Sequence, residues 1–128
     1  MSDQIAAASL TVPAAHDHIP FARLLTSGMA DRVGFDYEAI EDLRTAVHEL
    51  CKHLIDHVDA GEDVHLRLVA RTDELELTAV AERLPGRPPL PMDPLAQAIV
   101  AAVADEVELD TSGPVVSFRL LKRVGRSS

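Results

Sequence analysis

Residues 40–58 read IEDLRTAVHELCKHLIDHV, and hydrophobic side chains recur in this stretch at every third or fourth position. The recurring positions are Ile40, Leu43, Val47, Leu50, Leu54 and Val58. This spacing places them along one face of an α-helix. Asp36 lies just before the stretch and is of the residue type that caps helix N-termini. The sequence therefore predicts a helix that begins after Asp36 and buries one face in a core.

The segments on either side of this helix predict a strand, a helix and a hairpin. Residues 9–13 are typical of a short strand, and residues 19–32 carry hydrophobic positions at helical spacing. Residues 64–68 and 75–80 alternate between hydrophobic and polar side chains, and a polar turn separates them. This alternation predicts an antiparallel hairpin with one face in contact with solvent.

The last third of the chain begins with residues 83–94, which hold five of the eight prolines. Proline fixes φ and lacks a backbone N–H, so we expect an exposed, irregular connection here. Asp93 then predicts the cap of a helix that extends to about Ala104. Residues 106–110 and 115–121 predict two further strands. This order of elements fits an α/β (α+β) two-layer sandwich, in which three helices cover a mixed, mostly antiparallel sheet.

The 128 residues carry a formal net charge of −9, and 47% of them are hydrophobic but only 3% aromatic. The length predicts a single domain over residues 1–128, with an ordered core at about residues 9–123. The acidic balance argues against binding to nucleic acid or to an anionic membrane, because phosphate groups attract basic surfaces. The lone Cys51 cannot form an internal disulfide, and we expect neither a membrane span nor a secretion signal. The sequence thus favours a cytoplasmic protein that binds another protein.

Polar side chains follow one flank of the predicted central helix. Glu49, His53 and His57 are spaced four residues apart, which places them along one stripe. Such a stripe could bind a divalent metal ion. Metal sites usually also take ligands from a second element, so the sequence favours histidines along a half-buried flank. Cys51 lies beside the core face and is expected to be a buried small hydrophobic residue.

The last two predicted strands carry opposite charges. Acidic side chains lie at Asp105, Glu106, Glu108 and Asp110, and basic ones at Arg119, Lys122, Arg123 and Arg126. If the two strands pair, we expect these charges to meet across them and to stabilise the fold modestly.

Three stretches of the chain match a known family. They read IPFAR at residues 19–23, AVHELCKHLIDH at residues 46–57 and ADEVEL at residues 104–109. On these stretches and on the order of its elements, the chain resembles the anti-sigma factor serine kinases from about residue 10 to residue 122. These kinases are a branch of the histidine-kinase-like ATPase superfamily. The resemblance implies the histidine-kinase-like ATPase fold and a homodimer.

The resemblance also implies where a nucleotide site would lie. In the family, a Glu-x-x-x-Asn motif supplies a glutamate that activates the attacking hydroxyl and an asparagine that helps to hold magnesium. Glu49 matches the glutamate, but His53 stands at the asparagine position. Because magnesium prefers oxygen ligands to an imidazole, this replacement removes a natural magnesium contact.

Two glycine motifs of the family site are replaced as well. The Asp-x-Gly-x-Gly motif that holds adenine matches Ala81, Arg83 and Pro85, and the glycine pair that receives the phosphates matches Ala96 and Ala98. These changes remove the carboxylate that reads the adenine amino group and fill space that glycines leave open. The chain is therefore identified as a degenerate member of the family, which we expect to act without a cofactor.

Arg23 matches the arginine through which members of the family contact their partners. The resemblance implies an anti-sigma factor that binds an alternative sigma factor and is released by an anti-anti-sigma factor, without touching nucleic acid. An alternative is an ATP-dependent serine kinase that acts on an anti-anti-sigma factor, with Glu49 as its catalytic base and with bound ATP and magnesium. A third interpretation is a metal-responsive module built on Glu49, His53 and His57.

Overall fold

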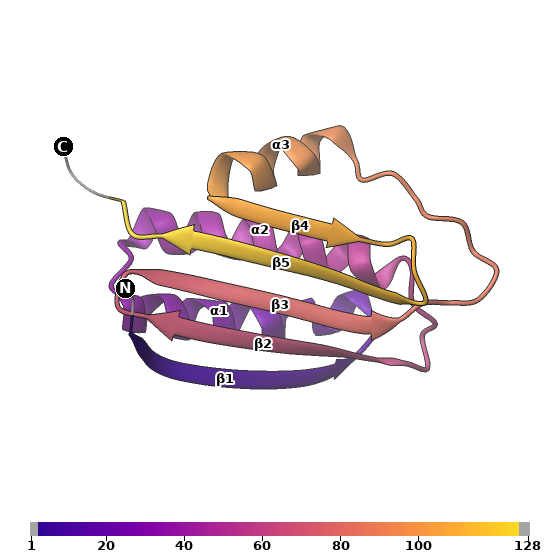
Figure 1. The fold of residues 1–128 in the computed structure, drawn as a ribbon, viewed down its shortest axis with the longest axis horizontal. Helices are drawn as coiled ribbons and strands as arrows, with labels where there is room; N and C mark the ends of the chain where they lie inside the picture. Colours follow the sequence, from indigo (N-terminus) through magenta and orange to yellow (C-terminus); the bar gives the residue numbers. More distant parts are fainter. Residues whose placement is uncertain (1–2, 126–128) are drawn as a thin grey trace.

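The computed structural model describes residues 3–125, and within them the chain forms five β-strands and three α-helices (Figure 1). A short 3-10 turn, His16–His18, precedes the first α-helix. The elements in chain order are β1 (Gln4–Pro13), α1 (Ile19–Val33), α2 (Tyr37–Ile55), β2 (Asp63–Arg71), β3 (Glu74–Glu82), α3 (Pro94–Val103), β4 (Glu106–Asp110) and β5 (Val115–Arg123). No helix within residues 3–125 combines the length and the apolar character needed to cross a membrane.

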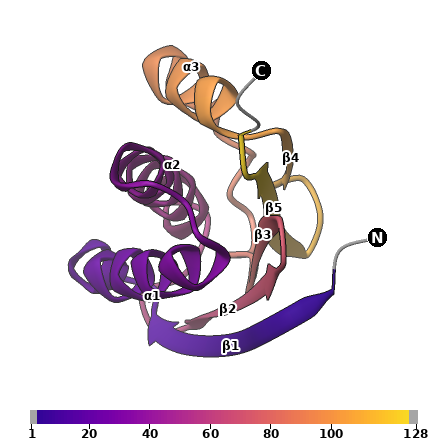
Figure 2. The same cartoon turned by 90° about the vertical axis from the view of Figure 1, so that its left-hand side faces the viewer.

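The strands of the described chain form one sheet in the order β1-β2-β3-β5-β4, and every pairing in it is antiparallel. The helices lie together on one face of this sheet, and the other face is left open (Figure 2). Alternate strand residues point toward the helices. Leu68 pairs with Leu77, Leu77 pairs with Leu120, and all three are fully buried. The core is therefore an aliphatic layer between the sheet and the helices.

Local signals in the sequence set the ends of α1 and α2. Gly34 ends α1 with a φ of 98°, a left-handed conformation that glycine adopts without steric cost. Asp36 then caps α2, because its carboxylate accepts a hydrogen bond of 2.8 Å from the backbone N–H of Ala39. The predicted apolar face of α2 is confirmed, since Leu43, Val47, Leu50 and Leu54 are all buried.

The predicted fold class and the order of the elements are confirmed, with three differences in detail. Strand β1 begins at Gln4 rather than at Ser9, because the alanines at residues 6–8 also pair with β2. These alanines show no alternation of hydrophobic and polar residues that would predict a strand. Helix α2 ends at Ile55, and Val58 is buried beyond it after a tighter turn in which its N–H bonds to the carbonyl of Ile55. The sheet is antiparallel throughout residues 3–125 rather than mixed.

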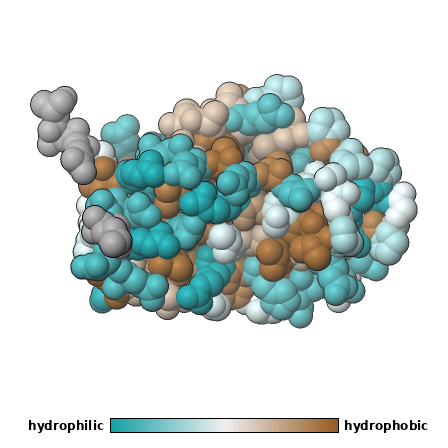
Figure 3. All heavy atoms as spheres, viewed as in Figure 1, coloured by the Kyte–Doolittle hydropathy of each residue, from teal (hydrophilic) through white to brown (hydrophobic). Residues whose placement is uncertain are grey.

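The open face of the sheet carries part of the predicted pairing of opposite charges, at Glu106. Glu106 on β4 accepts hydrogen bonds from Arg119 and Arg123 on β5, at 3.2 and 2.6 Å. Glu76 on β3 bonds both to Arg119 and to Arg71. Figure 3 shows this face, with hydrophilic side chains gathered over the left of the view and hydrophobic ones further right. Because the pairs are partly exposed, solvent screens them and each contributes only modestly to stability.

Arg126, which the sequence also placed among these charges, lies outside the described residues, as do Met1, Ser2, Ser127 and Ser128.

Candidate functional site

A polar hollow lies between α2, the connection that runs from Arg83 to Asp93, and the start of α3. Its volume is about 170 Å³. The residues that line it are Glu49, Lys52, His53, Asp56, Leu90, Pro91, Met92, Asp93 and Ala96. This is where the resemblance places the nucleotide-binding motif of α2.

Helix α2 supplies the polar wall of the hollow. Glu49 and His53 lie one turn apart on α2 and both face the hollow, with Glu49 half-buried and His53 buried. Burial lowers the pKa of His53, the nearby His57 lowers it further, and Asp56 opposes both. At neutral pH the His53 imidazole in the hollow is therefore uncharged.

The proline-rich connection supplies the opposite wall. Leu90, Pro91 and Met92 face the hollow, and Met92 is buried. Asp93 follows and caps α3, because its carboxylate accepts a hydrogen bond of 3.1 Å from the N–H of Ala96. The chain itself therefore fills part of the site and satisfies the N-terminus of α3.

His57 joins α2 to the connection from a fully buried position. Its Nδ1 lies 2.9 Å from the carbonyl oxygen of His53, and its Nε2 lies 2.9 Å from the backbone nitrogen of Leu90. A carbonyl oxygen only accepts and a backbone N–H only donates. The ring therefore carries its proton on Nδ1 and uses its Nε2 lone pair to hold Leu90.

Further hydrogen bonds fasten the connection to the end of α2. The N–H of Leu84 donates to the carbonyl of His57 at 2.9 Å. The guanidinium of Arg87 donates to the carbonyl of Asp56 at 2.6 Å. Arg83 donates to the carbonyl of Arg87 within the connection. The segment is mostly exposed, as the prolines predicted, but it is anchored at several points along its length.

The structure brings together some of the predicted site residues and separates others. Glu49, His53 and Ala96 line one hollow. Ala81 is buried on β3, where it pairs with Val116, and it does not line this hollow. Ala98 is exposed on α3, and the half-buried Arg23 belongs to α1, so neither contributes to the site.

The metal-binding interpretation is wrong for these residues. Within residues 3–125, no group of three or more His, Cys, Asp or Glu side chains is arranged to hold a metal ion. His57 has no free ring nitrogen, because both take part in hydrogen bonds. The interpretation of Cys51 is confirmed, since the side chain is buried and burial raises the pKa of its thiol to about 12.

Sequence reasoning missed the role of His57 and the way the connection closes over α2. The local signal was three apolar residues, Leu84, Leu90 and Met92, within an otherwise polar and proline-rich segment. Such residues in a connection indicate that part of it packs against the core.

Comparisons with known proteins point to one family. The chain is 34% identical over 82 residues to the serine-protein kinase RsbW of Bacillus pumilus, covering 60% of this chain and 51% of that protein. It is 36% identical over 76 residues to RsbW of Bacillus subtilis, covering 57% of this chain and 48% of that protein. It is 27% identical over 121 residues to RsbW of Oceanobacillus iheyensis, covering 79% and 77%. The chain spans about half the length of the first of these relatives.

A solved structure shares the fold. The crystal structure of the RsbU and RsbW domains of Rv1364c from Mycobacterium tuberculosis matches 97% of this chain and 34% of that one, with a TM-score of 0.69 and 16% identity. No family model matches the sequence.

Proposed function

Because the chain is similar to serine-protein kinases RsbW, we propose that it is an anti-sigma factor that acts by binding alone, without a working nucleotide site. In this proposal it sequesters an alternative sigma factor and releases it when an anti-anti-sigma factor binds. One observation carries the proposal: the hollow beside Glu49 and His53 is closed by the protein's own connection, which His57 holds in place.

The size and lining of the hollow support the loss of nucleotide binding. Its volume of about 170 Å³ is below the roughly 300 Å³ at which small-molecule pockets begin. Ala96 is buried and lines the hollow, so its methyl group takes space that a glycine of the family leaves open, and Ala81 has no carboxylate that could read adenine. The Asp93 carboxylate at the start of α3 would repel a phosphate group from that helix end.

Two side chains of the hollow, His53 and Lys52, are unfavourable for magnesium bound to a nucleotide. Magnesium requires oxygen ligands in a near-octahedral arrangement. The wall from α2 offers the Glu49 and Asp56 carboxylates, the His53 imidazole and the Lys52 ammonium group, which repels a cation. The proposed activity therefore uses neither ATP nor magnesium.

The exposed face of α1 supports a role in binding a partner. Phe21 and Leu24 are large hydrophobic residues on the exposed face of α1, and the half-buried Arg23 lies about 100° around the helix from Leu24. Arg23 makes no ion pair with another residue in the described chain. A partner carboxylate that pairs with Arg23, flanked by apolar contacts, would form an interface centre of the kind that contributes most to affinity.

The charge of the whole chain agrees with this proposal. A net charge of −9 favours approach to a basic partner, such as the DNA-facing surface of a sigma factor, and disfavours DNA itself. In this proposal the protein acts in the cytoplasm as a homodimer.

Two measurements test the proposal. The first is co-purification of the tagged protein with an identified sigma factor of its own organism. Arg23→Glu should abolish it, whereas Arg32→Glu, at an exposed arginine on the same helix, should not. Failure to retain any sigma factor, or equal losses in both variants, would overturn the proposed partner.

The second measurement is calorimetric titration with magnesium-ATP. We expect no binding heat. The alternative function, an ATP-dependent serine kinase that uses Glu49, rests on the kinase name of the relatives. Saturable binding that disappears in both Glu49→Gln and His53→Ala would establish a working nucleotide site and favour that alternative.

A further inference from the structure

Strand β4 forms one edge of the sheet and pairs with β5 alone. All of its residues are exposed. An open edge leaves a row of backbone N–H and C=O groups that can pair with another extended chain. The two faces of β4 differ in chemistry, and this difference determines which chain would fit.

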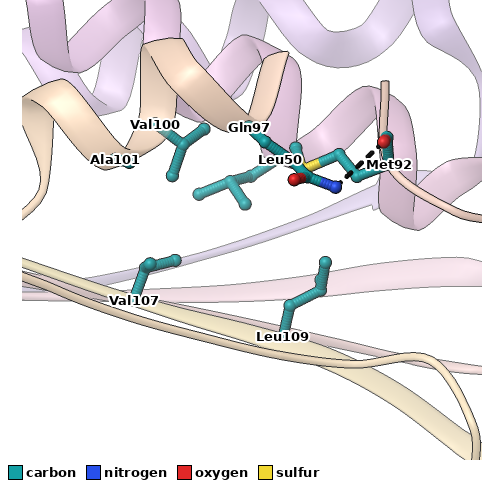
Figure 4. Close-up of a pocket in the computed structure, with 7 residues that line it drawn as sticks. All are labelled: Leu50, Met92, Gln97, Val100, Ala101, Val107 and Leu109. Atoms are coloured by element: carbon teal, nitrogen blue, oxygen red, sulfur yellow. Dashed lines mark hydrogen bonds between the residues drawn. The ribbon is translucent and has the colours of Figure 1, made fainter. Parts of the chain in front are cut away.

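The face of β4 that looks toward the helices is apolar. Val107 pairs with Leu120 and Leu109 with Phe118, and both of these partners belong to the core. Val107 and Leu109 nevertheless stay 42% and 38% exposed, because a second hollow of about 230 Å³ lies above them. Figure 4 shows both side chains pointing across this hollow toward the helices.

The side of this second hollow that faces β4, formed by α2, the connection and α3, is apolar as well. Leu50 of α2, Met92 of the connection, and Val100 and Ala101 of α3 line it. Its one polar lining residue, Gln97, donates a hydrogen bond of 3.0 Å to the carbonyl of Met92, within the hollow's own wall. The hollow is therefore suited to aliphatic side chains.

The opposite face of β4 is acidic. Glu106 already bonds to Arg119 and Arg123, and Asp110 bonds to Ser112. Glu108, between them on the same face, has no hydrogen bond or ion pair to another side chain in the described residues. Its carboxylate is exposed and available to a cation.

We propose that β4 binds an extended segment of a basic partner protein by strand addition. Aliphatic side chains of that segment enter the hollow beside Val107 and Leu109, and alternate Lys or Arg side chains lie next to Glu108. Strand β5 already meets the other side of β4 in this pattern, with Leu120 and Phe118 on the helix side and Arg119 opposite Glu108. This surface lies at the other edge of the sheet from β1, and the proposal stands apart from the proposed function.

Charge argues against a second copy of this chain as the occupant. Two β4 strands paired antiparallel about Glu108 would place that residue opposite itself, and Glu106 opposite Asp110. Like charges directly opposite each other destabilise a strand pair. A basic segment would instead place Lys or Arg side chains opposite these acidic residues, so that each contact becomes attractive.

The test uses the whole protein and a fluorescein-labelled synthetic peptide in which leucine and arginine alternate. A peptide of the same composition, with all leucines before all arginines, is the control ligand. Fluorescence anisotropy should show saturable binding of the alternating peptide only. Hydrogen exchange should show new protection of β4 amides in the complex and none in β1.

Two pairs of variants locate the contacts. Glu108→Lys should weaken binding roughly tenfold, whereas Glu82→Lys, at an exposed acid on β3, should change it by about twofold or less. Val107→Thr combined with Leu109→Thr should also weaken binding roughly tenfold. The matched control is Val80→Thr with Val115→Thr, at valines 42% and 49% exposed on the open face.

Several results would overturn the proposal. They are binding that does not depend on alternation, equal effects of the test and control variants, or protection that appears on β1 instead. Protection of β4 that rises with protein concentration in the absence of peptide would identify a second copy as the occupant and would also overturn it. None of these results depends on a sigma factor.

Discussion

His57 is predicted to hold the connection on α2, and His57→Phe tests this role. Phenylalanine keeps an aromatic ring of similar size but removes both ring hydrogen bonds. The carbonyl of His53 and the N–H of Leu90 then lose their partners. An unsatisfied buried backbone group costs about 1–3 kcal/mol, and Leu90 is partly exposed and can reach water, so its cost falls at the low end. We expect a loss of about 2–4 kcal/mol in the free energy of unfolding.

This loss is smaller than the stability of a typical domain, so the variant should fold. Urea unfolding followed by circular dichroism measures the change, and the melting temperature should fall by roughly 8–15 °C. Hydrogen exchange at the Leu90 amide should accelerate more than exchange at the amides of β2 and β3, because the connection opens before the core does.

The matched control is His48→Phe on the same helix. The Nδ1 atom of His48 is buried without a hydrogen-bond partner in the described chain, so its removal should leave stability unchanged or slightly higher. The reasoning about His57 is refuted if both variants change stability equally, or if Leu90 exchange in His57→Phe matches that of the parent protein.

Four other predictions follow from single residues. Burial and a neighbouring histidine lower the pKa of His53 from 6.5, so the unfolded chain takes up a proton first and stability falls as pH drops below about 6.5. His53→Asn should flatten this dependence in urea titrations between about pH 7 and 5.5. Burial of Glu76 favours a higher pKa, but hydrogen bonds from its two arginine partners outweigh burial and lower it from 4.5. The contribution of Glu76 to the free energy of unfolding is thus present above about pH 4.5 and lost below it. Glu76→Gln should therefore reduce the acid sensitivity of the melting temperature. Gly34→Ala should cost about 1 kcal/mol because φ is 98° there, whereas Gly28→Ala, inside α1 with open space around it, should stabilise by roughly 0.5–1 kcal/mol. Cys51 should resist a thiol reagent at pH 8 in the native protein and react at once in urea, since the pKa of its thiol is about 12 when buried; fast labelling of the native protein would contradict this.

The elements that the sequence predicted well are those whose signals are local. The 3.6-residue period of α2 and the cap at Asp36 lie within a few residues of the structure that they specify. The same holds for the alternation in β2 and β3 and for Asp93 at the start of α3. Strand β1 was underestimated because the alanines at its start become a strand only through pairing with β2.

The candidate site was predicted only in part, for a related reason. The positions of Glu49 and His53 on one side of α2 follow from helical spacing alone. His57 lies against His53 as the stripe predicted, with ring centroids 4.8 Å apart, but it does not line the hollow. The helix ends before it, and a tighter turn directs its ring beneath the connection rather than into the hollow.

The helices, the hairpin, the acidic charge and the residues that replace the motifs of the family can all be read from the amino-acid sequence. Each of these is a property of the composition or of neighbours along the chain. In contrast, the closure of the connection over α2 and the apolar and acidic faces of β4 at an open edge become visible only in the folded chain. Both depend on residues distant in sequence that the fold brings together, such as His57, which bonds to Leu90, and Leu50 and Val107, which line one hollow. The free energy of such contacts comes from packing and from hydrogen bonds that no local pattern records.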